Sequence, residues 1–185
     1  MLYLIIVIFS IIIALLRGGE MEKLSHISID GVYIFATALL LRVLIWMFEV
    51  LGFSLLSQYS SILLIASYLL LVFISLKNIN LPGFKYITLG LILNSFVIIV
   101  NGGKMPVIVN QQANQFLNHT NLLGNGQNLI HTLRDSNTLF AFLGDVIMLP
   151  KPLPDTSILS VGDIMIFVGL FVLIQKTMMQ EEGLQ

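Results

Sequence analysis

Five apolar segments, separated by clusters of glycine, proline or charge, constrain what this chain can fold into. They predict helices over residues 2–16, 31–51, 61–76, 86–101 and 161–175. A helix of about 20 residues crosses the hydrocarbon core of a bilayer. Only 10% of the residues are charged, whereas about 25% is usual for a soluble domain. We therefore expect an all-α membrane protein of about five transmembrane helices, forming a single membrane domain over residues 1–185.

The first apolar segment, Met1–Leu16, is short for a membrane span, at roughly 24 Å. A secretory signal carries positive charge before its apolar run and a small-residue cleavage site after it. Here no charged side chain precedes the segment, and Arg17-Gly18-Gly19 follows it. We therefore interpret the segment as an uncleaved first helix.

Positive charge in the short connections predicts how the helices cross the membrane, because cytoplasmic loops are rich in lysine and arginine. The positively charged residues in and beside these connections are Arg17, Lys23, Lys77, Lys85 and Lys176. With five helices, all of them fall on one side. We expect a multi-pass cell-membrane protein with its N-terminus outside, its C-terminus in the cytoplasm and residues 102–160 outside.

The outer segment 102–160 is too long for a plain connection. Val107–Leu117 is predicted to form a short amphipathic helix at the membrane interface. Thr138–Leu149 is apolar except around Gly144-Asp145 and too short to span as a helix, so we expect a re-entrant or interfacial piece. Ser160 and Asp163 have the spacing of a capping box that opens the last helix.

Three short motifs carry a resemblance to a known family. They are Leu16-Arg17-Gly18-Gly19, Asn101-Gly102-Gly103-Lys104-Met105-Pro106 and Phe142-Leu143-Gly144-Asp145. Together they resemble a family of small, uncharacterised bacterial integral-membrane proteins, known only as a domain of unknown function. The resemblance implies a compact membrane domain with motifs at helix ends and in the outer segment. It brings no reaction, ligand or catalytic residue.

Arg42 and Glu49 are ionisable residues inside the second predicted helix. Seven residues make about two turns, so both lie on one face, roughly 10 Å apart along the axis. Burying an arginine at mid-membrane costs at least about 2.5 kcal/mol, and such residues usually mark a functional site. They predict a polar site that binds an anionic group. Alternatively, Arg42 extends toward the membrane surface, pairs with Glu49 or caps backbone carbonyls.

Asn101 and Lys104 belong to a glycine-rich turn at the outer membrane surface. Exposed amides beside a lysine can hold a phosphate or a carboxylate. The same residue types also end a helix, with glycine past its last turn and a cation near its negative dipole. Asn94, within the fourth helix, is expected to join helices rather than to bind a ligand.

Asp145, His131 and Arg134 are the candidate site residues of the outer segment. A carboxylate in an apolar run near a histidine and an arginine is consistent with a polar pocket against the bundle, and burial would raise its pKa. The alternative is a turn aspartate that caps a short helix. With no cysteine and no metal-ligand spacing of histidines, we expect no metal and no cofactor.

We expect a non-enzymatic membrane protein whose outer face binds a lipid head group, a small amphiphile or a membrane-protein partner. A net charge of −1 gives no indication of nucleic-acid binding. One alternative is a membrane enzyme acting on a lipid or polyprenyl phosphate through Asp145, His131 and Arg134. Its carboxylates and histidines are sparse, which favours the non-enzymatic interpretation. Another alternative is a substrate-binding or accessory subunit of a transporter or larger membrane complex.

Overall fold

The protein is mostly helical, as its sequence predicts. A computed structural model describes residues 2–51, 59–108, 130–149 and 158–179, without the side chains of residues 49 and 50. In these ranges the α-helices are α1 (Leu2–Leu16), α2 (Val32–Leu51), α4 (Ser60–Lys77), α5 (Phe84–Val100) and α7 (Val161–Met178). The short elements are the 3-10 helices η1 (Met21–His26) and η2 (Ala141–Leu143) and the strands β1 (Met105–Val107), β2 (His131–Leu133), β3 (Ile147–Met148) and β4 (Ile158–Leu159).

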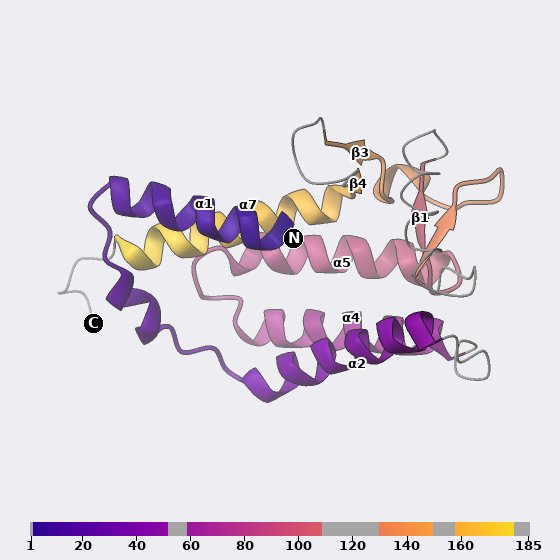
Figure 1. Cartoon of the computed structure of the whole chain (residues 1–185), viewed down its shortest axis with the longest axis horizontal. Coiled ribbons are helices and arrows are strands. Elements are labelled where there is room, and N and C mark those ends of the chain that lie inside the picture. The colour runs from indigo at the N-terminus through magenta and orange to yellow at the C-terminus, as the bar shows by residue number, and fades with distance from the viewer. Residues whose placement is uncertain (1, 52–58, 109–129, 150–157, 180–185) are drawn as a thin grey trace.

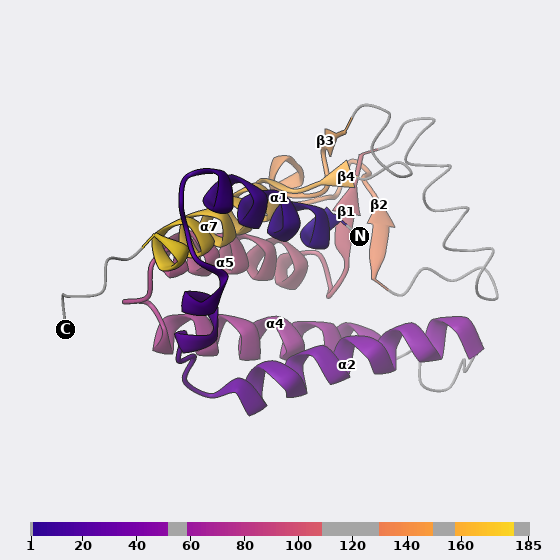
Figure 2. The same cartoon turned by 60° about the vertical axis from the view of Figure 1, so that its left-hand side comes forward.

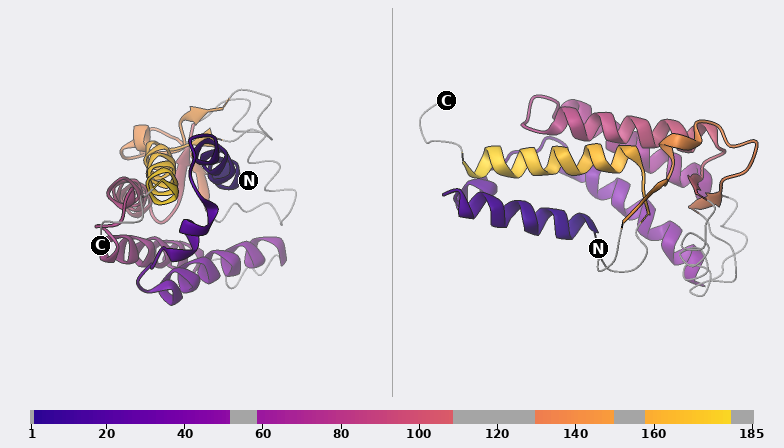
Figure 3. Two further views of the ribbon diagram at one scale, coloured as in Figure 1. Left: turned by 90° about the vertical axis from the view of Figure 1, so that its left-hand side faces the viewer. Right: turned by 90° about the horizontal axis from the view of Figure 1, so that it is seen from above.

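The five α-helices form one curved row. The main helix packings are α2 with α4, α4 with α5, α5 with α7, and α7 with α1. Viewed along the bundle, the row bends into a C with α1 and α2 at its two ends (Figure 3). Among the described residues α1 and α2 have no comparable packing with each other, so they form the two ends of the row.

The two ends of the bundle differ in chemistry. The C-terminal ends of α1, α4 and α7 lie at the end away from the strands (Figure 1). These helix ends carry Arg17, Lys77 and Lys176. The strands cover the opposite end, beside the end of α5 (Figure 2). Because successive helices run in opposite directions, the positively charged helix ends lie at one end of the bundle and the outer segment lies at the other.

The seam between α5 and α7 is built on facing glycines. A Cβ atom on Gly162 would lie 2.6 Å from the carbonyl oxygen of Gly90, and one on Gly169 would lie 2.7 Å from that of Gly83. Gly83 precedes α5 with φ 80°, a left-handed conformation that favours glycine. Gly83 and Gly90 are seven residues apart, as are Gly162 and Gly169, which is about two helical turns. The two backbones therefore contact each other at two positions along the seam.

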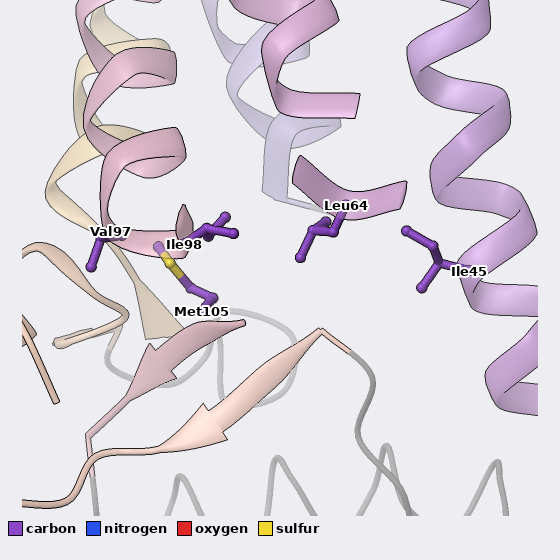
Figure 4. Close-up of a cluster of buried hydrophobic side chains, with 5 residues drawn as sticks. All are labelled: Ile45, Leu64, Val97, Ile98 and Met105. Atoms are coloured by element: carbon purple, nitrogen blue, oxygen red, sulfur yellow. The ribbon is translucent and has the colours of Figure 1, made fainter. Parts of the chain in front are cut away.

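A buried apolar cluster joins the strands to the helices. It consists of Ile45, Leu64, Val97, Ile98 and Met105 (Figure 4). These side chains come from α2, α4, α5 and β1, so burying them holds the start of the outer segment against three helices. Burial of each large aliphatic side chain contributes on the order of 1.5–3 kcal/mol in water, while in lipid the gain comes from close packing.

The outer segment contains strands that the sequence analysis did not predict. β1 pairs with β2 in parallel, with Met105 opposite His131 and Val107 opposite Leu133, and Val107 also forms a bridge with Asp145. The expected helix cannot begin at Val107, because this residue ends β1; residues 109–117 lie outside the described part. Pro106 favours extended backbone in Met105 before it, which explains the strand.

Thr138–Leu149 forms no re-entrant helix. It contains η2, only three residues long, then a bridge at Asp145, and then β3, which pairs antiparallel with β4. Within the described parts of residues 102–160, η2 is the only helix. Pairing between distant segments, which local apolar runs do not reveal, determines the structure here.

Candidate functional site

Arg42 of α2 points its guanidinium at an aromatic ring of the neighbouring helix. Its Cζ lies 4.3 Å from the centre of the Tyr68 ring on α4. Its Nε is buried and has no hydrogen-bond partner among the described residues. No carboxylate of these residues lies within 4.0 Å of it. A cation–π contact of this kind is worth about 1–2 kcal/mol, and it leaves a buried donor unused.

The Tyr68 hydroxyl interacts with several charged groups. The charges of Arg42, Asp163 and Asp145 all act on it. The charge of Arg42 also reaches the hydroxyl of Tyr3 on α1, at the other end of the helix row. Through these charges Arg42 and Tyr68 interact with groups of α1, α7 and the outer segment. We call Arg42, Tyr68, Asp145 and its neighbour His131 the Arg42 region.

The polar groups at the α5–α7 seam bond one another. Asn94 Nδ2 donates to Asp163 Oδ1 at 3.0 Å, and Ser160 Oγ donates to Asn94 Oδ1 at 2.8 Å. The Tyr3 hydroxyl donates to the same Asp163 oxygen at 2.8 Å. Ser160 and Asp163 form the predicted capping box of α7. This seam network joins α1, α5 and α7, which supports the structural role expected for Asn94.

His131 and Asp145 lie together in the outer segment. His131 Nε2 is 3.6 Å from Asp145 Oδ2, and Asp145 is only 6% exposed. Burial, and to a smaller extent the charge of Asp163, raises the pKa of Asp145 to about 8. Burial lowers the pKa of His131 to about 4, although the charge of Asp163 opposes this. Near neutral pH the pair is therefore an uncharged carboxylic acid beside an uncharged imidazole.

The backbone of the outer segment holds Asp145 in place. Its amide donates to the carbonyl of Pro106 at 2.8 Å, and its own carbonyl accepts from Ile108 at 3.0 Å. The residue is thus part of the sheet-like layer rather than the cap of a helix. Its backbone is thus held in the layer, and its carboxyl group lies 3.6 Å from His131 Nε2.

Asn101 fastens the outer segment to the end of α5. Its Nδ2 donates to the carbonyls of Val97 and Leu139, at 2.8 and 2.9 Å, and its Oδ1 accepts from the Leu139 amide at 3.0 Å. Gly103, with φ 84°, donates to Ile98 and closes the helix end. The motif therefore ends a helix, as one interpretation of the sequence predicts. Lys104 follows directly and is half-buried.

The remaining candidates lie apart from this region or beyond description. Arg134 is exposed, and its backbone amide donates to Val107 at 2.9 Å. Glu49 lies in the last turn of α2, with its side chain outside the described part. The structure thus pairs Arg42 with Tyr68 and Asp145 with His131, and the charge of Asp145 also acts on Tyr68. Sequence reasoning did not place Tyr68, Tyr3 or Asp163 at the candidate site. Tyrosines within apolar helices were the available signal for the first two.

Comparison with known proteins identifies relatives of unknown function. An uncharacterised protein of Thermotoga maritima is 29% identical over 165 residues, which is 89% of this chain and 85% of that protein. No solved structure matches the chain. The model of a family of unknown function, DUF5317, matches residues 26–175. The chain therefore belongs to the DUF5317 family of unknown function.

Proposed function

We propose that this chain is an integral membrane protein that binds the anionic head of an amphiphile at Arg42. The membrane part rests first on its outward-facing side chains. Leu4 of α1 is 64% exposed, Tyr33 of α2 73% and Ile62 of α4 64%. Large apolar surfaces of this kind are rare on soluble monomers, whereas lipid is a suitable solvent for them.

Helix length and composition support the same placement. In the described ranges, α4 and α7 are long and apolar enough to cross a bilayer, and α1, α5 and residues Val32–Phe48 of α2 are shorter apolar helices. Near the strands, Phe140 lies edge-on to Phe96, at 4.9 Å, and to Phe142, at 6.3 Å, between ring centres. Phe142 is 64% exposed. Exposed aromatic groups at one end of a bundle are consistent with an outer membrane interface.

The observation that carries the binding proposal is the unused donor of Arg42. A buried donor without an acceptor costs about 1–3 kcal/mol, and a cation within an apolar helix costs at least about 2.5 kcal/mol. The seam residues Asn94, Ser160 and Asp163, in contrast, bond one another. A bound phosphate or carboxylate would supply an acceptor for Arg42 Nε and a counter-charge, neither of which the described residues provide.

An amphiphile fits this position better than a water-soluble anion does. Among the described residues α1 and α2, the two ends of the row, have no extensive packing with each other, and both helices present apolar side chains outward. An acyl or prenyl chain can lie against these side chains while its head group reaches Arg42 and the hydroxyls of Tyr68 and Tyr3. Entry from the outer leaflet would bring the head group near His131 and Asp145.

Native mass spectrometry of the protein purified from its own membrane tests the binding. Wild-type protein should retain an anionic amphiphile, and Arg42→Gln should lose it without a loss of thermal stability. Arg134→Gln is the matched control, because this arginine is exposed on the outer segment. Equal retention by both variants would contradict the proposal. Retention of a stoichiometric protein instead would favour an accessory subunit.

The orientation is proposed as the positive charges predict, with the N-terminus outside and the C-terminus in the cytoplasm. Because the chain has no cysteine, single cysteines report their side of the membrane cleanly. Ser136→Cys, at an exposed position of the outer segment, should react with an impermeant maleimide in intact cells, and Ser25→Cys only after lysis. The reverse pattern would invert the orientation, and labelling of both in intact cells would contradict the membrane placement.

A second function is favoured by the His131–Asp145 pair. A protonated carboxyl beside a neutral imidazole has the groups needed for general acid–base catalysis, so a lipid phosphate held by Arg42 would be a reasonable substrate. Phosphate release from lipid and polyprenyl phosphates, compared between wild type and Asp145→Asn, tests this. No turnover by the folded wild-type protein would leave binding as the function.

A further inference from the structure

A second, separate feature lies at the end of the bundle away from the strands. A groove of about 600 Å³ opens there between the ends of α1 and α7 and the turn that joins α4 to α5. Arg17 and Lys176 line it together with the apolar side chains of Phe171, Val172 and Met179. Two cations and several apolar side chains thus line one groove at the end of the bundle that carries the positively charged helix ends.

The arginine of this groove is held in a defined direction. Arg17 Nη1 donates to Gln175 Oε1 at 2.8 Å, and Gln175 Nε2 donates to the carbonyl of Ser10 at 2.7 Å. Gln175 is only 6% exposed, so its amide is a fixed support rather than a mobile surface group. No carboxylate of the described residues lies within 4.0 Å of Arg17 or Lys176.

We infer that this groove binds one anionic phospholipid of the cytoplasmic leaflet, with its phosphate on Arg17 and Lys176 and an acyl chain along Phe171 and Val172. The charge pattern identifies the occupant, because basic pockets between helices on the cytoplasmic side attract acidic head groups. The apolar walls require an occupant that also has a hydrocarbon chain. The inference rests on the proposed membrane placement but does not depend on Arg42.

Both cations also have a simpler explanation. Arg17 follows the last turn of α1 and Lys176 lies in the last turn of α7, where cations stabilise the negative end of the helix dipole. That explanation predicts a loss of thermal stability on neutralisation and no lipid preference. The two explanations therefore differ in a measurable quantity.

Native mass spectrometry of the detergent-purified protein, titrated with phosphatidylglycerol or phosphatidylcholine, tests the inference. Wild type should bind one phosphatidylglycerol in preference to phosphatidylcholine. Lys176→Gln and Arg17→Gln should each weaken phosphatidylglycerol binding about fivefold, the contribution of one cation near an anionic lipid. Lys77→Gln is the control, because Lys77 is exposed at the same end and does not line the groove. Lys176 is also exposed, so its replacement should not unfold the protein.

Three results would overturn the inference. They are equal binding of the two lipids by wild type, equal phosphatidylglycerol binding by Lys176→Gln and Lys77→Gln, and displacement of the lipid by millimolar inorganic phosphate. Arg42→Gln should leave this binding intact. Arg42→Gln should therefore remove only the amphiphile proposed at Arg42, and Lys176→Gln should weaken only the binding of the groove lipid. The two proposals can thus fail independently.

Discussion

The α5–α7 seam and the Arg42 region both place polar side chains among apolar helices, but they use them differently. At the seam, Asn94, Ser160 and Asp163 exchange hydrogen bonds of 2.8–3.0 Å, and facing glycines let the two backbones touch. In the Arg42 region, a buried guanidinium nitrogen has no acceptor among the described residues, and a buried acid lies beside a histidine.

This difference distinguishes polar groups that stabilise the fold from polar groups that are available to a ligand. Polar groups that bond one another stabilise helix packing and have little capacity left for a ligand. Polar groups buried without such partners cost free energy, and proteins commonly retain them where they bind or react. Each of the following substitutions tests whether the two regions divide in this way.

The largest effect is expected from Gly162→Ala. The new Cβ would lie 2.6 Å from the carbonyl of Gly90 and would overlap the Asn94 amide, so the helices must separate. We expect the free energy of unfolding to fall by about 3 kcal/mol, measured by denaturant or thermal unfolding in detergent. Leu89→Phe also enlarges a side chain, but at an exposed position of α5, and should change little. Equal stability of both variants would contradict the close contact of the two helices at Gly162.

The pH dependence of the free energy of unfolding tests the burial of Asp145 in the Arg42 region. Its pKa is raised from 3.8 to about 8, and that of His131 is lowered from 6.5 to about 4. Between pH 4 and 6.5 the folded protein holds an extra proton on Asp145 while the unfolded chain holds one on His131, so the two contributions cancel. Between pH 6.5 and 8 only Asp145 contributes, and stability should fall as pH rises, by at most about 2 kcal/mol.

Thermal unfolding of wild type and Asp145→Asn at pH 6.5 and pH 8 measures this effect. The asparagine stays uncharged, so the variant should lose the decline that wild type shows. A decline of the same size in both proteins would assign it to another group and would contradict a buried, protonated Asp145.

A smaller effect is expected from Asn94→Ala. It removes two hydrogen bonds of the seam network, and bonds between membrane helices are worth about 1 kcal/mol or less each. We expect a loss of about 1 kcal/mol in the free energy of unfolding. Ser95→Ala is the matched control, since Ser95 is buried on the same helix and, within the described part of the chain, its hydroxyl bonds only the carbonyl of Leu91 in its own preceding turn. If Ser95→Ala were as costly, the network would have no special role.

The smallest effect on stability is expected from Arg42→Met. Methionine keeps much of the apolar volume and removes a buried charge, so the thermal midpoint should stay the same or rise. Binding of the proposed amphiphile should nevertheless be lost. A midpoint that falls as far as that of Gly162→Ala would show that Arg42 serves the fold.

The sequence predicts the helices well because their apolar runs and terminal glycines are local signals. The predicted helix 2–16 coincides with α1, and the expected start of the last helix at Val161 is that of α7. The capping box at Ser160 is also confirmed. The strands could not be predicted, because β1 and β2 are three residues long and pair between segments far apart in the chain.

The candidate site could be predicted only in part. Arg42 and Asp145 stand out because charge is conspicuous in an apolar run. The approach of Tyr68 to Arg42 depends on how α2 and α4 are rotated against each other, and the nearness of Asp163 depends on the glycine seam. Neither follows from spacing along one helix, so sequence reasoning treated Asp163 only as a capping residue.

A crystal structure of the protein purified with its native lipids would show whether an anionic ligand lies beside Arg42. The account predicts density for a non-protein anionic group about 3 Å from Arg42 Nε, with its hydrocarbon chain leaving between α1 and α2. The contrary result is an Arg42 guanidinium that pairs with the carboxylate of Glu49 or with backbone carbonyls, with no other density beside it.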